Sequence, residues 1–136
     1  MKLLVDTNVL ISAVIRDRLP DQVIKHIVAQ DDWLWLVTPE IDGEYRRVLN
    51  RPKFRLAADV VSWWLKFLES STIPAVSDLE EVEFPRDPKD SMFLAAANAT
   101  GADYLITGDK DFEAARRLIT TRIVTVAEFA KLFNIA

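Results

Sequence analysis

The sequence contains no cysteine and only three glycines among its 136 residues. Without cysteine, the chain can form no disulfide framework, thiolate zinc site or thiol nucleophile. It also lacks any run of about 18 apolar residues, the length that would cross a membrane as a helix. Its start, MKLLVDTNVL, is interrupted by Asp6 and Asn8 too early for the apolar core of a signal peptide. We therefore expect a soluble cytoplasmic protein.

Positive charge is also scarce, because 17 Lys and Arg stand against 21 Asp and Glu, a net charge of −4. This balance argues against a protein that holds nucleic acid by bulk positive charge, although a local basic track remains open. The one histidine, His26, lies among apolar residues of a predicted helix, so a histidine-based ribonuclease mechanism is not favoured. Half of the residues are hydrophobic, and the length predicts one domain over residues 1–136.

Predicted strands and helices alternate along the chain. Continuous apolar runs predict strands over 2–6, 33–37, 72–76, 104–107 and 122–126. Helical periodicity and capping residues predict helices over 7–15, 20–30, 39–50, 56–70, 88–100 and 127–133, with a short helix after Gly108 and an acidic loop over 77–86. Such alternation predicts an α/β fold, a three-layer α/β/α sandwich with a mainly parallel central sheet.

Four acidic residues fall where this fold places its ligands, beyond the carboxyl ends of the strands. Asp6 closes the first predicted strand, and Asp109 follows the fourth. Glu44 flanks the apolar stripe of the helix over 39–50, and Asp90 shares a face with apolar residues of the helix over 88–100. The pattern predicts that all four carboxylates converge on one pocket.

Each acid also has an ordinary explanation when taken alone. Asp6 or Asp109 could cap the helix that follows it, and Asp90 could interact with a helix dipole. Glu44 could pair with an arginine of the segment that follows it. Four converging carboxylates would repel, at about 4 kcal/mol for a pair 4 Å apart in an effective dielectric of 20. A hard divalent cation such as Mg²⁺ or Mn²⁺ offsets such charge well, because it prefers carboxylate oxygens and water.

Three blocks of sequence resemble a known family. They are LLVDTNVLISA, EYRRVLNRPKF and DPKDSMFLAAANATGADYLITGDKDF, in this order along the chain. Together they resemble the PIN-domain nucleases, and most closely the VapC-like ribonucleases, the toxins of bacterial and archaeal toxin–antitoxin modules. The resemblance extends over nearly the whole chain, although residues 52–86 carry no distinctive motif.

The resemblance implies an Mg²⁺- or Mn²⁺-dependent endoribonuclease that leaves a 5′-phosphate and a 3′-hydroxyl. It implies that catalysis and metal binding fall to an acidic quartet of Asp6, Glu44, Asp90 and Asp109. Weaker candidates for contacts with the substrate or with the quartet are Asn8, Thr107 and Asp111, whereas Asp87 suits a helix cap. An antitoxin partner and a homodimer are also implied. The alternatives are a catalytically silent PIN-fold binding module and a metal-dependent nuclease that acts on DNA.

Two further segments have more than one interpretation. Residues 46–58 contain no acid and five cations, namely Arg46, Arg47, Arg51, Lys53 and Arg55. This segment is either a phosphate track for RNA, with Arg46 and Arg47 nearest to Glu44, or a solvated helix end. The run VVSWWLKFL over 60–68 is apolar around most of its predicted helix. It could serve as core, as a homodimer face or as a groove for an antitoxin.

Overall fold

The sheet at the centre of the molecule consists of five parallel strands in the order β3-β2-β1-β4-β5. The computed structural model describes residues 1–15, 18–75, 88–108 and 120–135, except for the side chains of residues 88–91. The strands are β1 (Lys2–Val5), β2 (Leu34–Val37), β3 (Thr72–Pro74), β4 (Tyr104–Thr107) and β5 (Arg122–Thr125). The first strand therefore lies in the middle, and its carboxyl end meets those of β2 and β4.

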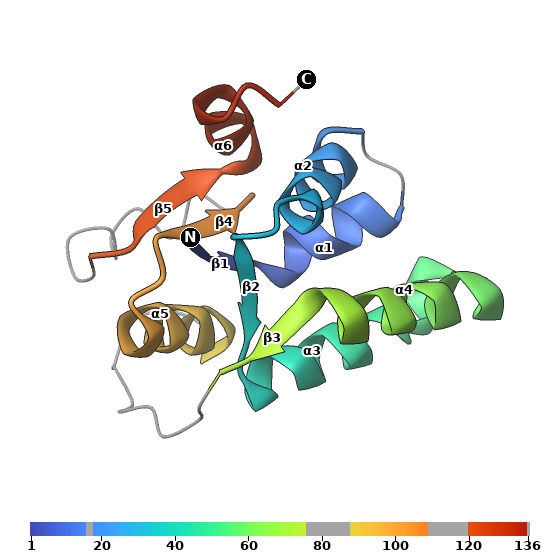
Figure 1. Cartoon of the computed structure of the whole chain (residues 1–136). Coiled ribbons are helices and arrows are strands. Elements are labelled where there is room, and N and C mark those ends of the chain that lie inside the picture. Colours follow the sequence, from blue (N-terminus) through green and yellow to red (C-terminus); the bar gives the residue numbers. More distant parts are fainter. Residues whose placement is uncertain (16–17, 76–87, 109–119, 136) are drawn as a thin grey trace.

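Helices connect these strands and cover the sheet. They are α1 (Thr7–Val14), α2 (Arg18–Ala29), α3 (Pro39–Leu49), α4 (Ala58–Ser71), α5 (Pro88–Thr100) and α6 (Val126–Leu132), with a 3-10 turn η1 (Pro52–Phe54) before α4. Figure 1 shows α1 and α2 on one side of β1 and β2, and α5 on the other. The layered α/β fold predicted from the sequence is confirmed.

The core forms where the apolar strands meet these helices. Leu3, Leu4 and Val5 of β1 are all buried, as expected for a strand covered on both faces. A continuous cluster of buried apolar side chains extends from them across both sides of the sheet. No helix in the described part of the chain is long and apolar enough to cross a membrane.

Local chemistry determines several helix ends. Thr38 caps α3 by accepting the Ile41 N–H, and Pro39 occupies its first turn. Thr125 and Glu128 form a capping box at the start of α6. Gly101 follows α5 with φ 65°, the left-handed conformation that glycine adopts without strain. The helix ends predicted near Pro39 and Gly101 are confirmed.

Two predicted helix starts differ from the structure by two residues. α2 begins at Arg18 instead of Pro20, because a proline within the first turn removes only an N–H that has no partner inside the helix. α4 begins at Ala58 instead of residue 56, since the 3-10 turn and Arg55, at φ 48°, redirect the chain before it. The predicted loop over 77–86 and the helix after Gly108 lie outside the described residues.

Candidate acidic site at the carboxyl edge of the sheet

Asp6 lies directly after β1 and is 6 % exposed. Its backbone occupies the N-cap position of α1, but its side chain makes no capping hydrogen bond. Instead, the Thr107 hydroxyl at the end of β4 donates to Asp6 Oδ2 at 2.9 Å. The carboxylate thus lies across the junction of two neighbouring strands, and helix capping does not account for it.

Glu44 lies on the second turn of α3 and is 4 % exposed. The Thr7 hydroxyl donates to Glu44 Oε2 at 2.7 Å. None of the ion pairs within the described residues involves Glu44, so the predicted alternative of an arginine partner is not observed there. Its side chain is directed toward the start of α1.

These two contacts bring Asp6 and Glu44 to one place. Thr7 is the residue after Asp6, and its hydroxyl contacts Glu44. Two acids that are 38 positions apart in sequence therefore both contact residues at the carboxyl ends of β1 and β4. Hydrogen bonds to charged groups contribute about 1.5–3 kcal/mol each to stability. Thr7 and Thr107 hold the two carboxylates in fixed orientations without adding a positive charge.

Tyr45 lies beneath this pair as a fully buried residue. Its hydroxyl donates to the Val5 carbonyl and accepts from Trp35 Nε1 at 3.4 Å. Burial raises the pKa of Tyr45 far above its ordinary value, and the negative charges of Asp6 and Glu44 raise it further.

The other two acids of the predicted quartet are described less completely. Asp90 lies in the first turn of α5, and its side chain is outside the description. α5 packs against α3 and β4, and three residues separate its end from the start of β4, so its first turn lies toward the carboxyl edge of the sheet. Asp109 follows Gly108 immediately after β4, and like Asp111 and Asp87 it is outside the described residues.

The described donors at this edge fit a hard divalent cation in kind. Asp6 and Glu44 provide carboxylate oxygens, the ligands that Mg²⁺ and Mn²⁺ prefer. Within the parts of the chain that the structure describes, no group of three acidic or histidine side chains is close enough to hold a metal ion. Asp6 and Glu44 are therefore the two buried carboxylates that the described residues place at this edge.

The two predicted arginines differ in their surroundings. Arg46 Nε lies 3.0 Å from Asp42 Oδ2, and its terminal nitrogen lies 3.5 Å from Glu69 Oε1. The hydrogen bond to Asp42 raises the pKa of Arg46. Arg47 is exposed and forms no ion pair with any described residue. Arg47 is therefore the better placed of the two to bind a phosphate.

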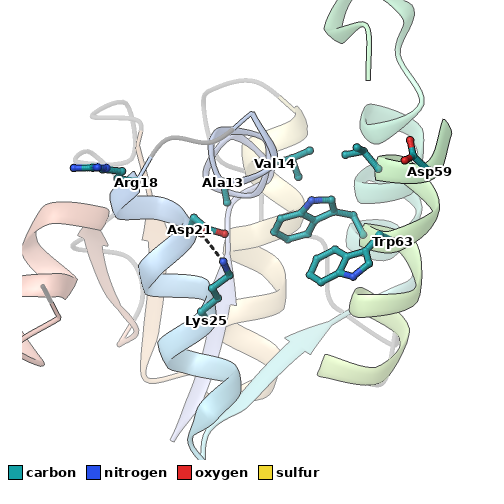
Figure 2. Close-up of a pocket in the computed structure, with 9 residues that line it drawn as sticks. Ala13, Val14, Arg18, Asp21, Lys25, Asp59 and Trp63 are labelled. Atoms are coloured by element: carbon teal, nitrogen blue, oxygen red, sulfur yellow. Dashed lines mark hydrogen bonds and ion pairs between the residues drawn. The ribbon is translucent and has the colours of Figure 1, made fainter. Parts of the chain in front are cut away.

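A groove of about 820 Å³ separates α4 from α1 and α2. Figure 2 shows Trp63 on the groove side of α4, opposite Ala13 of α1 and the Asp21–Lys25 ion pair of α2. Trp63 is 54 % exposed and stacks on Phe67, whereas Trp64 is buried. The apolar run over 60–68 thus contributes to the core and also leaves an aromatic surface uncovered.

Two residues that contact the acids or the strand beside them, Thr7 and Tyr45, were not predicted from the sequence. Thr7 could have been noticed as a hydroxyl between two polar candidates, in the DTN block that begins at Asp6. Tyr45 follows Glu44 and resembles an ordinary apolar helix position, so no signal in the sequence identified it. The ring of His26 packs at a tilt against Trp33, with 5.4 Å between the ring centroids.

Comparisons with known proteins agree with this architecture. No curated protein matched the sequence. A chain in the crystal structure of VapBC2 from Rickettsia felis, bound to a DNA fragment from their promoter, has a similar fold with a TM-score of 0.65. The match covers 92 % of this chain and 98 % of that chain at 12 % sequence identity, so the likeness concerns the fold alone. The family model of the PIN domain matches residues 2–111. The chain therefore belongs to the PIN domain family, as the three sequence blocks predicted.

Proposed function

We propose that this PIN-domain protein is a metal-dependent endoribonuclease and the toxin of a toxin–antitoxin pair. The observation that carries the proposal is that two buried carboxylates, Asp6 and Glu44, are each held by a threonine hydroxyl at the carboxyl edge of the sheet. Membership of the PIN family supports a nuclease. Because burying charge is costly, two buried carboxylates at one edge of the sheet indicate a functional role and not a contribution to stability.

In this proposal, Asp6 and Glu44 hold Mg²⁺ or Mn²⁺ together with Asp90 and Asp109. When bound, such an ion makes water a nucleophile near neutral pH and neutralises charge on a phosphodiester. Thr107 and Thr7 keep the carboxylates of Asp6 and Glu44 in place. A carboxylate oxygen of Glu44 or Asp90 accepts the proton of the attacking water, and cleavage leaves a 5′-phosphate and a 3′-hydroxyl.

Substrate binding is assigned to the basic segment after Glu44. Arg47 is exposed at the end of α3, and Arg51 and Lys53 follow it on the way to α4. Cations in such positions bind phosphates regardless of base sequence. Arg46 makes a smaller contribution, because Asp42 and Glu69 already engage it. A short basic track of this kind is compatible with an overall charge of −4.

The groove beside α4 is the proposed antitoxin site. Its volume and the exposed Trp63 suit an apolar peptide segment, with Asp21, Lys25 and Asp59 at the rim for polar contacts. The structural neighbour belongs to a complex named VapBC2, which supports a partner protein by analogy. The homodimer and the cytoplasmic location predicted from the sequence stay predictions.

The proposal is tested with the purified full-length chain and labelled single-stranded and structured RNA. We expect cleavage with Mg²⁺ or Mn²⁺, none with EDTA, and none by Asp6→Asn. The control is Asp21→Asn, which removes a carboxylate of the groove rim. Single-stranded and duplex DNA are offered in parallel, and preferential cleavage of DNA would replace RNA as the substrate. A folded, metal-loaded chain that cleaves neither would establish the silent binding module instead.

The antitoxin site has its own test. The open reading frames that adjoin the gene are inspected for a small DNA-binding protein, which is then co-expressed and purified with the chain. Trp63→Ala should weaken this complex about tenfold or more, because aromatic anchors dominate such interfaces. Val28→Ala, which changes an exposed apolar residue outside the groove, should leave it intact. Equal binding by both variants would remove the groove from the interface.

A further inference from the structure

A second hollow, of about 570 Å³, lies beside the acidic pair. It is formed by α1, the start of α2, and the junctions that follow β4 and precede α6. It is lined by Asn8, Val9, Ser12, Leu19, Pro20, Gly108, Thr125, Val126 and Ala127. None of these residues carries a charge. The hollow thus differs from the acidic edge and from the basic segment after Glu44.

The backbone places this hollow next to the proposed reaction centre. Asn8 lies two residues after Asp6, and Gly108 follows Thr107, whose hydroxyl donates to Asp6. Two separate segments therefore lead directly from the acidic pair into the hollow. A group bound there would lie within about one nucleotide of a phosphate at Asp6, because one helix turn spans about 5.4 Å.

The wall of the hollow offers several hydrogen-bonding groups. Asn8 and Ser12 are one turn apart on the same face of α1. Neither side chain forms a hydrogen bond with any other described residue, and Asn8 is exposed. An asparagine amide both donates and accepts, and a serine hydroxyl does the same. Thr125 accepts the Glu128 N–H, which leaves its hydroxyl proton for another acceptor.

We infer that this hollow binds one nucleoside of the RNA substrate, the base and ribose next to the cleaved phosphate. The lining that the described residues contribute is neutral, which suits a base and a sugar, whereas a phosphate would call for cations. Apolar side chains such as Val9 and Val126 suit the faces of a base, and the Asn8 amide suits its hydrogen-bonding edge. The volume falls within the roughly 300–1,000 Å³ of small-molecule sites. This inference rests on the proposed function and assigns Asn8 and Ser12 to base preference.

The first experiment measures binding without catalysis. The four ribonucleoside 5′-monophosphates are titrated into the full-length protein in EDTA, and saturation-transfer NMR reports contact with the base and ribose protons. We expect transfer to at least one nucleotide, lost in Ala127→Leu, which fills the hollow. Ala29→Leu places the same change at an exposed site of α2 outside the hollow and should retain the transfer. No transfer in the wild type, or equal transfer in both variants, overturns the inference.

The second experiment measures base preference in cleavage. The ends produced from a random-sequence RNA pool are sequenced for the wild type, Asn8→Ala and Ser12→Ala, after thermal unfolding has shown that the variants fold. Asn8→Ala should reduce the preference at one position beside the cut by about tenfold, the scale of one bidentate base contact. An unchanged preference overturns the inference while the proposed function stands. Nucleotide binding without any RNA cleavage would overturn the proposed function and, with it, the assignment of the hollow to a substrate.

Discussion

Acidic side chains differ in burial and in their partners between the carboxyl edge of the sheet and the surroundings of α4. At the edge, Asp6 and Glu44 are buried and accept hydrogen bonds from neutral threonine hydroxyls. Around α4, the partly exposed acids face cations. Asp21 forms an ion pair with Lys25, drawn as a dashed line in Figure 2, and Asp42 and Glu69 both contact Arg46.

Exposed ion pairs and hydrogen bonds to buried carboxylates differ in what they contribute. Exposed ion pairs contribute about 0–1 kcal/mol each, and salt screens them. Burying a carboxylate costs several kcal/mol in lost hydration, and a neutral hydroxyl donor compensates this cost only in part. Neutral hydroxyls contact the acids at the carboxyl edge, whereas cations contact the acids around α4.

Among the variants that test this comparison, Asp6→Asn should have the largest effect. The amide keeps the shape of the carboxylate but loses its charge and half of its acceptor capacity. We expect RNA cleavage to fall by about 10²-fold or more, the scale of removing a positioned catalytic group. The free energy of unfolding should stay level or rise, because one of two neighbouring negative charges is gone. Initial rates and urea unfolding measure the two effects.

The matched control for Asp6 is Asp21→Asn, which makes the same change on the exposed side. Its cleavage rate should stay within about twofold of the wild type, and its stability should fall by no more than about 1 kcal/mol. Comparable losses of cleavage in both variants would show that the buried and exposed acids do not differ in role.

Thr7→Val sharpens the comparison by removing the donor and leaving the acid. Valine has nearly the shape of threonine, so the buried carboxylate of Glu44 loses its hydrogen bond without a large cavity. The free energy of unfolding should fall by about 1–3 kcal/mol. Thr100→Val removes a hydroxyl that donates to the neutral Ala96 carbonyl and should cost about 1 kcal/mol or less. Urea denaturation with unchanged m-values measures both, and equal costs would contradict a special role for Thr7.

Tyr45→Phe tests whether the buried phenol next to Glu44 makes stability depend on pH. The pKa of Tyr45 is raised above its ordinary value of 10.0 in the folded state, so the protonated phenol stabilises the fold fully below pH 10. Above pH 10 the unfolded chain ionises first, and this contribution falls by up to about 1.4 kcal/mol per pH unit. The variant should lose about 1 kcal/mol at pH 7 through its hydrogen bond to Val5 and then decline less steeply above pH 10.

The control for Tyr45 is Tyr104→Phe, which removes the other tyrosine and leaves Tyr45 in place. It should retain the alkaline decline of the wild type in urea unfolding between pH 8 and 11. A parallel decline in the wild type and both variants would show that Tyr45 does not couple folding to pH.

Features that depend on neighbouring residues were predictable from the sequence. Thr38 and Pro39 start α3, and Gly101 ends α5, because capping and left-handed glycine act over three or four positions. The parallel sheet followed from the alternation of strands and helices. The start of α4 was predicted two residues early, since a 3-10 turn carries only a weak signal.

The partners of the acids were not predictable in the same way. Capping by Asp6 and pairing of Glu44 with an arginine were both reasonable from local sequence. The structure replaces them with contacts to Thr107, 101 positions from Asp6, and to Thr7, 37 positions from Glu44. The packing of β1 against β4 and of α1 against α3 determines these partners, and no local sequence pattern predicts that packing. The order of the three sequence blocks pointed to the PIN domain family, which the spacing of the acids alone could not do.

Arg47→Ala and Arg46→Ala extend the comparison to the cations, with the smallest expected effects. Both residues lie in the last turn of α3, but only Arg46 is engaged by acids, Asp42 and Glu69. If exposed unpaired cations bind the substrate, Arg47→Ala should weaken RNA binding several-fold and reduce the slope of log Kd against log salt by about 0.7. Arg46→Ala should change that slope by less than half as much, because its charge is already partly neutralised. Binding to an uncleavable RNA in EDTA, measured at several salt concentrations, distinguishes the two. Identical slopes in the wild type and both variants would make this end of α3 a solvated surface, and the phosphate track would then have to lie elsewhere on the molecule.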